Sequence, residues 1–135
     1  METFLLDKDI TVFYIQALSF PDGVMGAHQQ LHAAIPRTAN RRYFGLSRPE
    51  GKQGITYKAA AEELLKGEGA RLGFETLLLP KGTYKGMELK NFRTDVSAIG
   101  KTFAQLTSLP DIDPNAYCVE LYLGENDVRC MVRMK

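Results

Sequence analysis

The chain has no tryptophan, only two cysteines and two histidines, and no long hydrophobic run among its 135 residues. None of its apolar stretches approaches the roughly 20 residues that a membrane-spanning helix needs. The opening residues, METFLLDKDI, lack the basic start and the long apolar stretch of a signal peptide. We therefore expect a cytoplasmic protein without membrane association, in which both cysteines are free thiols.

A large charge of either sign is also missing. Lysine and arginine total 17, aspartate and glutamate total 16, and the formal net charge is +1. Proteins that bind a phosphate backbone usually carry a clustered basic excess, so we expect no direct binding of nucleic acid. In HQQLH, His28 and His32 stand one helical turn apart, but no third ligand is evident. We predict neither a metal site nor a cofactor.

What is present is typical of a globular protein. Hydrophobic residues make up 44% of the chain and charged residues 24%, which is an ordinary balance. A chain of this length buries roughly two thirds of its unfolded surface. No linker rich in proline, glycine and serine divides it, so we expect a single domain over residues 1–135.

Hydrophobic periodicity predicts similar elements in both halves of the chain. In the first half, DITVFYIQALSF is strand-like, VMGAHQQLHAAIP is a short helix, and RRYFGLS and GITYKAAAEEL are strands. In the second half, FETLLL and YKGMELK are strands, Asn91 to Leu109 is a helix, and AYCVELY and DVRCMVRM form a hairpin. We expect Asn91 to cap the long helix and Val96 to lie on its apolar stripe.

The common order predicts an α+β fold built from duplicated strand-helix-strand-strand units. The pseudo-repeats span about residues 8–66 and 72–135, and KGEGARLG falls at the connection between them. The strands form one antiparallel sheet, and we expect two helices to cover one of its faces.

The closing hairpin contains a carboxylate, Glu120, although glutamate is a poor strand former. With GEND as the loop, Leu123 opposes Val128 and Glu120 opposes Met131. Alternation then places Glu120 on the face away from the helices, together with Tyr122. Spacing leaves two interpretations open. Glu120 is either solvated and paired with a nearby arginine, or it lines a ligand pocket with an aromatic neighbour.

Three phrases in this order carry a resemblance to a known family. They are Phe44-Gly45 followed by Tyr57, then Pro80-x-Gly82-x-Tyr84, and finally Glu120-x-Tyr122. In order and spacing, over about residues 8–134, the chain resembles GyrI-like small-molecule-binding domains. These are also the effector-binding domains of AraC- and MerR-type regulators. No helix-turn-helix segment accompanies it here, so a DNA-binding role needs another chain.

The resemblance implies a concave antiparallel sheet with a ligand cleft between the two repeats. It maps the family's buried acid, which receives cationic or lipophilic ligands, onto Glu120. The ligand-binding residues that we predict on this basis are Glu120, Tyr122, Tyr84, Tyr57 and Phe44.

Two other functions are implied by relatives of the same kind. One is a small-molecule hydrolase with Glu120 as the catalytic acid or base and Tyr84 or Tyr122 as its partner. The other is an interaction protein that binds a partner such as gyrase. Our leading prediction is a stand-alone domain that binds a hydrophobic, cationic or amphipathic small molecule and is linked to transcriptional regulation, stress or detoxification. A protein partner and a homodimer are left open.

Overall fold

A computed structural model describes all residues from Met1 to Lys135. Its frame is a single eight-stranded antiparallel sheet with the order β1-β6-β8-β7-β3-β4-β2-β5. The strands are β1 (Glu2–Leu6), β2 (Ile10–Gln16), β3 (Tyr43–Pro49), β4 (Ile55–Glu62), β5 (Glu75–Leu79), β6 (Gly82–Leu89), β7 (Cys118–Leu123) and β8 (Asp127–Arg133). The helices are α1 (Val24–Ala34), α2 (Glu68–Arg71) and α3 (Ser97–Thr107), with 3-10 turns η1 (Gly51–Gln53) and η2 (Phe92–Thr94).

The sheet order confirms the duplicated strand-helix-strand-strand units. Outward from the centre run β3, β4 and β2 on one side, and β7, β8 and β6 on the other. Each triplet surrounds one long helix in the sequence: α1 lies between β2 and β3, and α3 lies between β6 and β7. The two units therefore meet where β3 pairs with β7.

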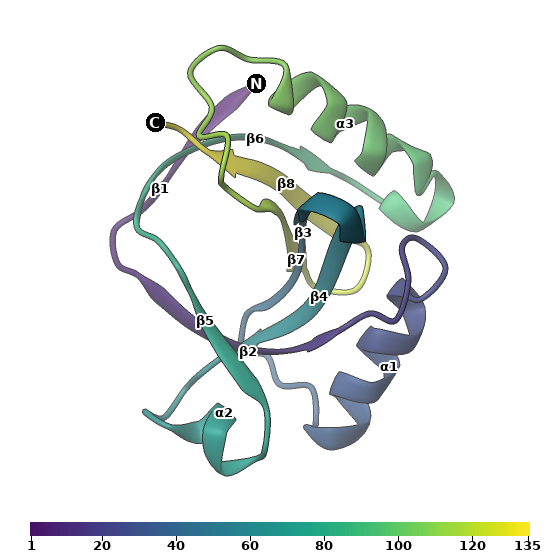
Figure 1. Cartoon of the computed structure of the whole chain (residues 1–135), viewed down its shortest axis with the longest axis vertical. Coiled ribbons are helices and arrows are strands. Elements are labelled where there is room, and N and C mark those ends of the chain that lie inside the picture. Colours follow the sequence, from purple (N-terminus) through teal and green to yellow (C-terminus); the bar gives the residue numbers. More distant parts are fainter.

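The edges of the sheet are exchanged between the units. Strand β1 precedes β2 in the chain but pairs with β6, whereas β5 precedes β6 but pairs with β2. Figure 1 shows the consequence: the sheet curls round into a partial ring, with α1 and α3 packed outside it. None of the helices is long and apolar enough to cross a membrane.

Both faces of the sheet are therefore covered. Inside the curl lies one core, which includes Val12, Leu46 and Met131. Outside it lie two further cores. The first, with Leu31, packs under α1, and the second, with Leu106, packs under α3. This closure means that neither face of β7 points into bulk water.

The predicted register of the hairpin is wrong by one residue. Leu123 pairs with Asp127 and Glu120 pairs with Cys130, so the loop has three residues instead of four. Gly124 permits the tighter turn because it adopts a φ of +69°. The Asp127 carboxylate accepts a hydrogen bond from the backbone N–H of Asn91 at 3.0 Å, which holds it at the start of β8.

That shift also corrects the predicted face of the acid. Glu120 shares a face with Val128, Cys130 and Val132, the β8 residues that pack beneath α3. It therefore lies on the helix-covered face, whereas it was expected on the opposite one.

Other predicted elements differ at their ends. The second long helix begins at Ser97, not at Asn91, because Asn91 takes a left-handed φ of +51° and the backbone of Asp95 is not helical. Phe92 is buried through the separate turn η2, whereas Val96 is exposed. The sequence patterns did not predict β1 or the four-residue helix α2.

Candidate functional site

Glu120 lies at the centre of the sheet, where the two units join. One row of paired residues crosses the outer face there, from Ala59 on β4 through Gly45 and Glu120 to Cys130 on β8. Ala59 packs beneath α1 and Cys130 beneath α3. Glu120 therefore stands between the two helix-covered cores. Its side chain is buried, with 8% of the residue exposed.

Two tyrosine hydroxyls hold the carboxylate. Tyr122, two residues further along β7, donates to Glu120 Oε1 at 2.6 Å, and Tyr57 from β4 donates to the same oxygen at 3.2 Å. The hydroxyls lie 3.1 Å apart. Because both partners are neutral donors, they stabilise a negative charge on Glu120 without cancelling it.

Gly45 makes this arrangement possible. A Cβ at that position would overlap the Tyr57 hydroxyl and would lie 2.8 Å from Glu120 Oε1. Tyr57 can therefore reach across β3 to the acid only over a residue without a side chain. The glycine of the phrase Phe44-Gly45 has a packing role in the site, which the sequence alone did not reveal.

Helix α1 contributes a fourth polar group, His28. Its Nε2 atom lies 2.8 Å from the Tyr57 hydroxyl and 3.3 Å from the Tyr122 hydroxyl. Burial, with a smaller contribution from nearby His32, lowers the pKa of His28 from 6.5 to about 4. The imidazole is thus neutral at physiological pH. When both tyrosines donate to Glu120, His28 Nε2 carries a proton and donates to Tyr57.

His28 was considered at the sequence level only as half of a metal pair with His32. In the structure the two rings stack at 6.5 Å, and no group of three metal-ligating side chains comes together anywhere in the chain. The useful signal was the position of His28 on the buried side of its helix, one residue after Ala27.

Glu120 has no cationic partner. None of the seven salt bridges in the structure includes it. Burial raises the pKa of Glu120, and the hydrogen bonds from Tyr122 and Tyr57 partly oppose that rise. Burial and the charge of Glu120 also raise the pKa of both tyrosines, which remain protonated donors.

Both cysteines are close to the acid and share its face. Burial, with a smaller contribution from the charge of Glu120, raises the pKa of Cys118 to about 11 and that of Cys130 to about 12. They are free thiols, as expected, and both lie on the face of the sheet that carries Glu120. Their high pKa values make them poor nucleophiles.

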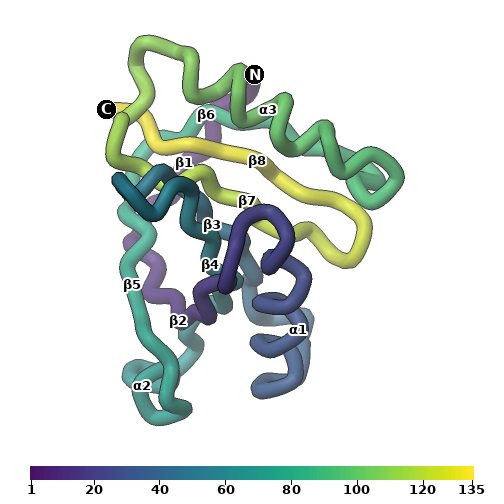
Figure 2. Tube along the Cα trace, turned by 45° about the vertical axis from the view of Figure 1, so that its right-hand side comes forward, coloured from purple at the N-terminus to yellow at the C-terminus, as the bar shows by residue number.

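The loop between β2 and α1 covers this group. Phe20 stacks on the Tyr57 ring with centroids 6.0 Å apart, and 42% of Phe20 is exposed. Figure 2 shows this loop passing across the strands in the space between α1 and β8. Ala17 anchors its start, since the Ala17 N–H donates to the Tyr57 carbonyl at 2.8 Å.

The structure brings together three of the five predicted ligand-binding residues: Glu120, Tyr122 and Tyr57. The other two, Tyr84 and Phe44, lie inside the curl, on the opposite face of the sheet. Tyr84 donates its hydroxyl to the Pro80 carbonyl at 2.7 Å, so it is not the tyrosine beside Glu120.

Comparisons with known proteins identify the fold. No protein family model and no curated protein sequence matches the chain. Among solved structures, an integron cassette protein from the mobile metagenome of Vibrio cholerae aligns with a TM-score of 0.73 and 12% identity, over 99% of this chain and 95% of that one. The protein SAV2435, bound to tetraphenylphosphonium, aligns at 0.70 and 13% identity, over 99% and 93%.

A third similar structure comes from Staphylococcus aureus MU50 and is named as a bacterial transcription regulation protein. It aligns with a TM-score of 0.62 and 13% identity, over 98% of this chain and 97% of that one. At such identities the likeness establishes the fold, and it assigns no role to any residue of this chain.

Proposed function

We propose that the protein binds a lipophilic organic cation, with Glu120 as its counter-ion. The observation that carries this proposal is a carboxylate that is 8% exposed, held by two tyrosine hydroxyls and left without a salt bridge. A buried charge is costly unless it is paired. A bound cation would supply the missing partner and would regain part of that cost.

Aromatic side chains around Glu120 suit the apolar body of such a ligand. Tyr57, Tyr122 and Phe20 present ring faces and edges, and aromatic faces attract cations as well as apolar groups. At an effective dielectric constant of about 20, two opposite charges 4 Å apart attract by about 4 kcal/mol. The carboxylate would therefore select cations among ligands of similar shape.

Phe20 is the side chain that such a ligand would have to displace. It covers Tyr57 from a loop, it is half exposed, and it stacks on a ring of the site itself. A flat aromatic ligand could take its place against Tyr57 without loss of stacking contact.

Two further observations support the proposal that this domain binds a small molecule. SAV2435, which shares the fold, is bound to tetraphenylphosphonium. The phrases around Phe44-Gly45, Pro80-x-Gly82-x-Tyr84 and Glu120-x-Tyr122 resemble GyrI-like effector-binding domains. We infer an effector-binding domain of that kind, which would act in regulation or detoxification.

Calorimetric titration with tetraphenylphosphonium at pH 7.5 tests the proposal, with neutral triphenylphosphine oxide as the matched probe. We expect saturable binding of the cation and at least about tenfold weaker binding of the neutral compound. Glu120→Gln keeps a hydrogen-bond acceptor for both tyrosines. It should also weaken the binding of tetraphenylphosphonium by about tenfold or more, which corresponds to about 1.4 kcal/mol. Equal affinities for wild type and Glu120→Gln would refute the assignment.

A pair of glycine variants tests the geometry of the site. Gly45→Ala should displace Tyr57, weaken cation binding by about tenfold and lower stability by about 1–3 kcal/mol, because the new methyl group overpacks the site. Gly26→Ala is the control, since a Cβ at Gly26 on α1 meets no atom within 4 Å. It should leave binding unchanged, as measured by the same titration. Unaltered binding in Gly45→Ala would contradict the described contact.

A further inference from the structure

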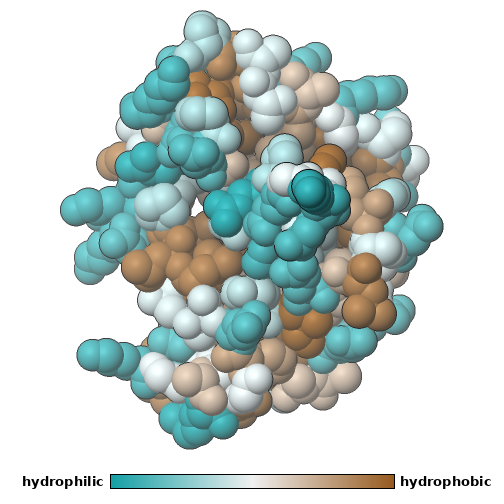
Figure 3. All heavy atoms as spheres, viewed as in Figure 1, coloured by the Kyte–Doolittle hydropathy of each residue, from teal (hydrophilic) through white to brown (hydrophobic).

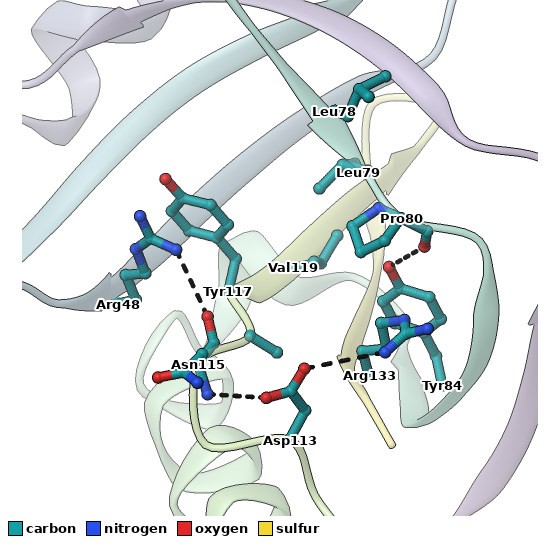
Figure 4. Close-up of a pocket in the computed structure, with 11 residues that line it drawn as sticks. Arg48, Leu78, Leu79, Pro80, Tyr84, Asp113, Asn115, Tyr117, Val119 and Arg133 are labelled. Atoms are coloured by element: carbon teal, nitrogen blue, oxygen red, sulfur yellow. Dashed lines mark hydrogen bonds and ion pairs between the residues drawn. The ribbon is translucent and has the colours of Figure 1, made fainter. Parts of the chain in front are cut away.

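A hollow lies inside the curl, on the face of the sheet opposite Glu120. Its volume is about 230 Å³, and its lining includes Arg48, Tyr84, Asp113, Tyr117, Val119 and Arg133. Figure 4 shows Arg48 stacked on Tyr117 on one side, Arg133 beside Tyr84 on the other, and apolar side chains of Leu79 and Val119 between them. In Figure 3 apolar surface lies within the ring of strands, bordered by hydrophilic residues.

The turn before β6 positions one of the two arginines. Arg133 Nε donates to the Lys81 carbonyl at 3.0 Å, and the guanidinium packs directly on Gly82. A Cβ at Gly82 would lie 2.9 Å from Arg133 Nε, and its φ of +141° is one that side chains rarely adopt. Pro80, which precedes Lys81 in the same turn, accepts a hydrogen bond from the Tyr84 hydroxyl through its carbonyl oxygen, at 2.7 Å. The phrase Pro80-x-Gly82-x-Tyr84 thus builds this hollow and not the Glu120 site.

Arg133 is only weakly neutralised. Its one salt-bridge partner is Asp113, at 3.8 Å from Nη1, and both side chains remain about 30% exposed. Asp113 is itself occupied, because its Oδ1 accepts the Asn115 N–H at 2.9 Å. The two Nη groups of Arg133 therefore retain donor capacity toward the hollow.

The opposite wall adds further positive charge. The Arg48 guanidinium lies 4.1 Å from the Tyr117 ring centroid, and the Lys58 ammonium lies 5.3 Å from the same centroid. Only Glu50 balances these two cations, with Arg48 Nε at 2.9 Å and Lys58 Nζ at 3.6 Å. Among the residues that line the hollow itself, Arg48 and Arg133 are cationic and only Asp113 is a carboxylate, which favours an anion.

We propose that this hollow binds a small aromatic or aliphatic carboxylate, with Arg133 as its counter-ion. The guanidinium presents parallel N–H donors that match the two oxygens of a carboxylate. Leu79, Val119 and the Tyr84 ring would contact the apolar body. At roughly 30 Å³ for a water-sized group, the volume holds about eight such groups, the size of one ring with a carboxylate. This site is independent of the cation site at Glu120.

A titration followed by ¹H–¹⁵N NMR tests the proposal, with benzoate as the anionic probe and benzamide as its neutral match. We expect saturable shifts at Val119, Tyr84 and Arg133 with benzoate, at a Kd on the order of 1 mM. Benzamide should bind at least about tenfold more weakly. Absence of saturation by ~10 mM benzoate, or equal binding of benzamide, would overturn the proposal.

Variants of the pair Arg133 and Asp113 give opposite predictions. Arg133→Gln should weaken the binding of benzoate about tenfold. Asp113→Asn keeps the acceptor for the Asn115 N–H but removes the competing negative charge, so it should strengthen the binding of benzoate about threefold. Glu120→Gln is the control on the other face and should leave benzoate binding unchanged. The proposal fails if Asp113→Asn weakens benzoate binding, or if the shifts occur around Glu120. The Asp113 variant decides the question even if Arg133→Gln does not fold.

Discussion

The buried carboxylate of Glu120 lowers the stability of the fold at neutral pH. Burial raises its pKa above the ordinary value of 4.5, because the charged form has lost its water and gained only two hydroxyl donors. An acid whose pKa is higher in the folded than in the unfolded protein contributes fully to stability at pH values below its unfolded pKa, where it is protonated. That contribution is lost as the pH rises through the folded value. Glu120 therefore has a stability cost at pH 7, which is consistent with the counter-ion role proposed for it.

Replacing this acid should make the protein more stable at neutral pH. Glu120→Gln stays uncharged, so its free energy of unfolding should exceed that of wild type at pH 8 by on the order of 1 kcal/mol for each unit of raised pKa. The difference should shrink toward pH 4, where Glu120 is protonated. Thermal melts by circular dichroism at both pH values measure it. Glu2→Gln, at an exposed carboxylate, is the control and should have little effect at either. If Glu120→Gln were less stable than wild type at pH 8, the charged Glu120 would not be destabilising as described.

At this scale the sequence predicted part of the site. The phrase Glu120-x-Tyr122 is local, since residues two apart on a strand share a face, and Tyr57 followed from the order of the phrases. His28 approaches the acid from a helix about 90 residues away in the chain, and only tertiary packing brings it there. Tyr84 was placed at the site by resemblance, yet its strand presents it to the inside of the curl.

At the scale of elements, the closing hairpin shows how one residue changes an interpretation. Side chains alternate between faces, so a slip of one residue between β7 and β8 moves every β8 residue relative to Glu120. GEND contains a glycine and two turn formers, and a three- or a four-residue loop fits it equally well. Which of the two loops forms depends on Asp127, whose carboxylate accepts hydrogen bonds from the Asn91 N–H and the Lys90 ammonium of another segment.

Helix α2 illustrates a different limit of prediction. Its four residues are too few for a periodic pattern, and a long-range ion pair holds it in place. Arg41 donates from Nη1 and Nη2 to the two carboxylate oxygens of Glu68, each at 2.9 Å, and both side chains are about nine tenths buried. The hydrogen bonds from Arg41 lower the pKa of Glu68 from 4.5 to about 2.

Breaking this pair should weaken the fold without affecting the Glu120 site. Glu68→Gln leaves Arg41 partly unpaired and should lower the free energy of unfolding at pH 7 by about 2 kcal/mol. Because the folded pKa of Glu68 is depressed, its contribution is present above pH 4.5 and is lost as the pH falls toward about 2. Urea unfolding between pH 7 and pH 3 should show the wild-type advantage shrinking.

The exposed pair Lys90–Asp127 provides the control for that measurement. The Lys90 side chain is 69% exposed, so Lys90→Met should change stability by less than about 0.5 kcal/mol. Tetraphenylphosphonium affinity should be unchanged in both variants. A stability loss as large in Lys90→Met as in Glu68→Gln would argue against a special role for the buried pair.

For the whole molecule, the class and the duplicated units could be predicted from periodicity, but the closure of the sheet could not. The sequence patterns did not predict strand β1, which pairs with β6 about 80 residues later in the chain. That pairing and its counterpart between β5 and β2 curl the sheet and bury the inner face. Alternation along β7 alone left open whether the face that carries Glu120 is solvated, whereas both faces of β7 are covered in the structure. Glu120 is buried on the outer face, where it stands between the cores beneath α1 and α3.

The exchanged edge strands should make the two units unfold together. Leu79 lies on β5, which belongs in sequence to the second unit but pairs with Ile10 in the first, and it is 1% exposed in the core that both units share. Leu79→Ala should cost about 2–5 kcal/mol through lost burial and a residual cavity. Because each unit contributes strands to the same inner core, amide hydrogen exchange should speed up by a similar factor in β4 and in β8, on opposite sides of the sheet. Urea unfolding followed by circular dichroism and by tyrosine fluorescence should remain a single coincident transition. Faster exchange confined to β2 and β5, or two separate transitions, would show that the units unfold independently despite the exchange.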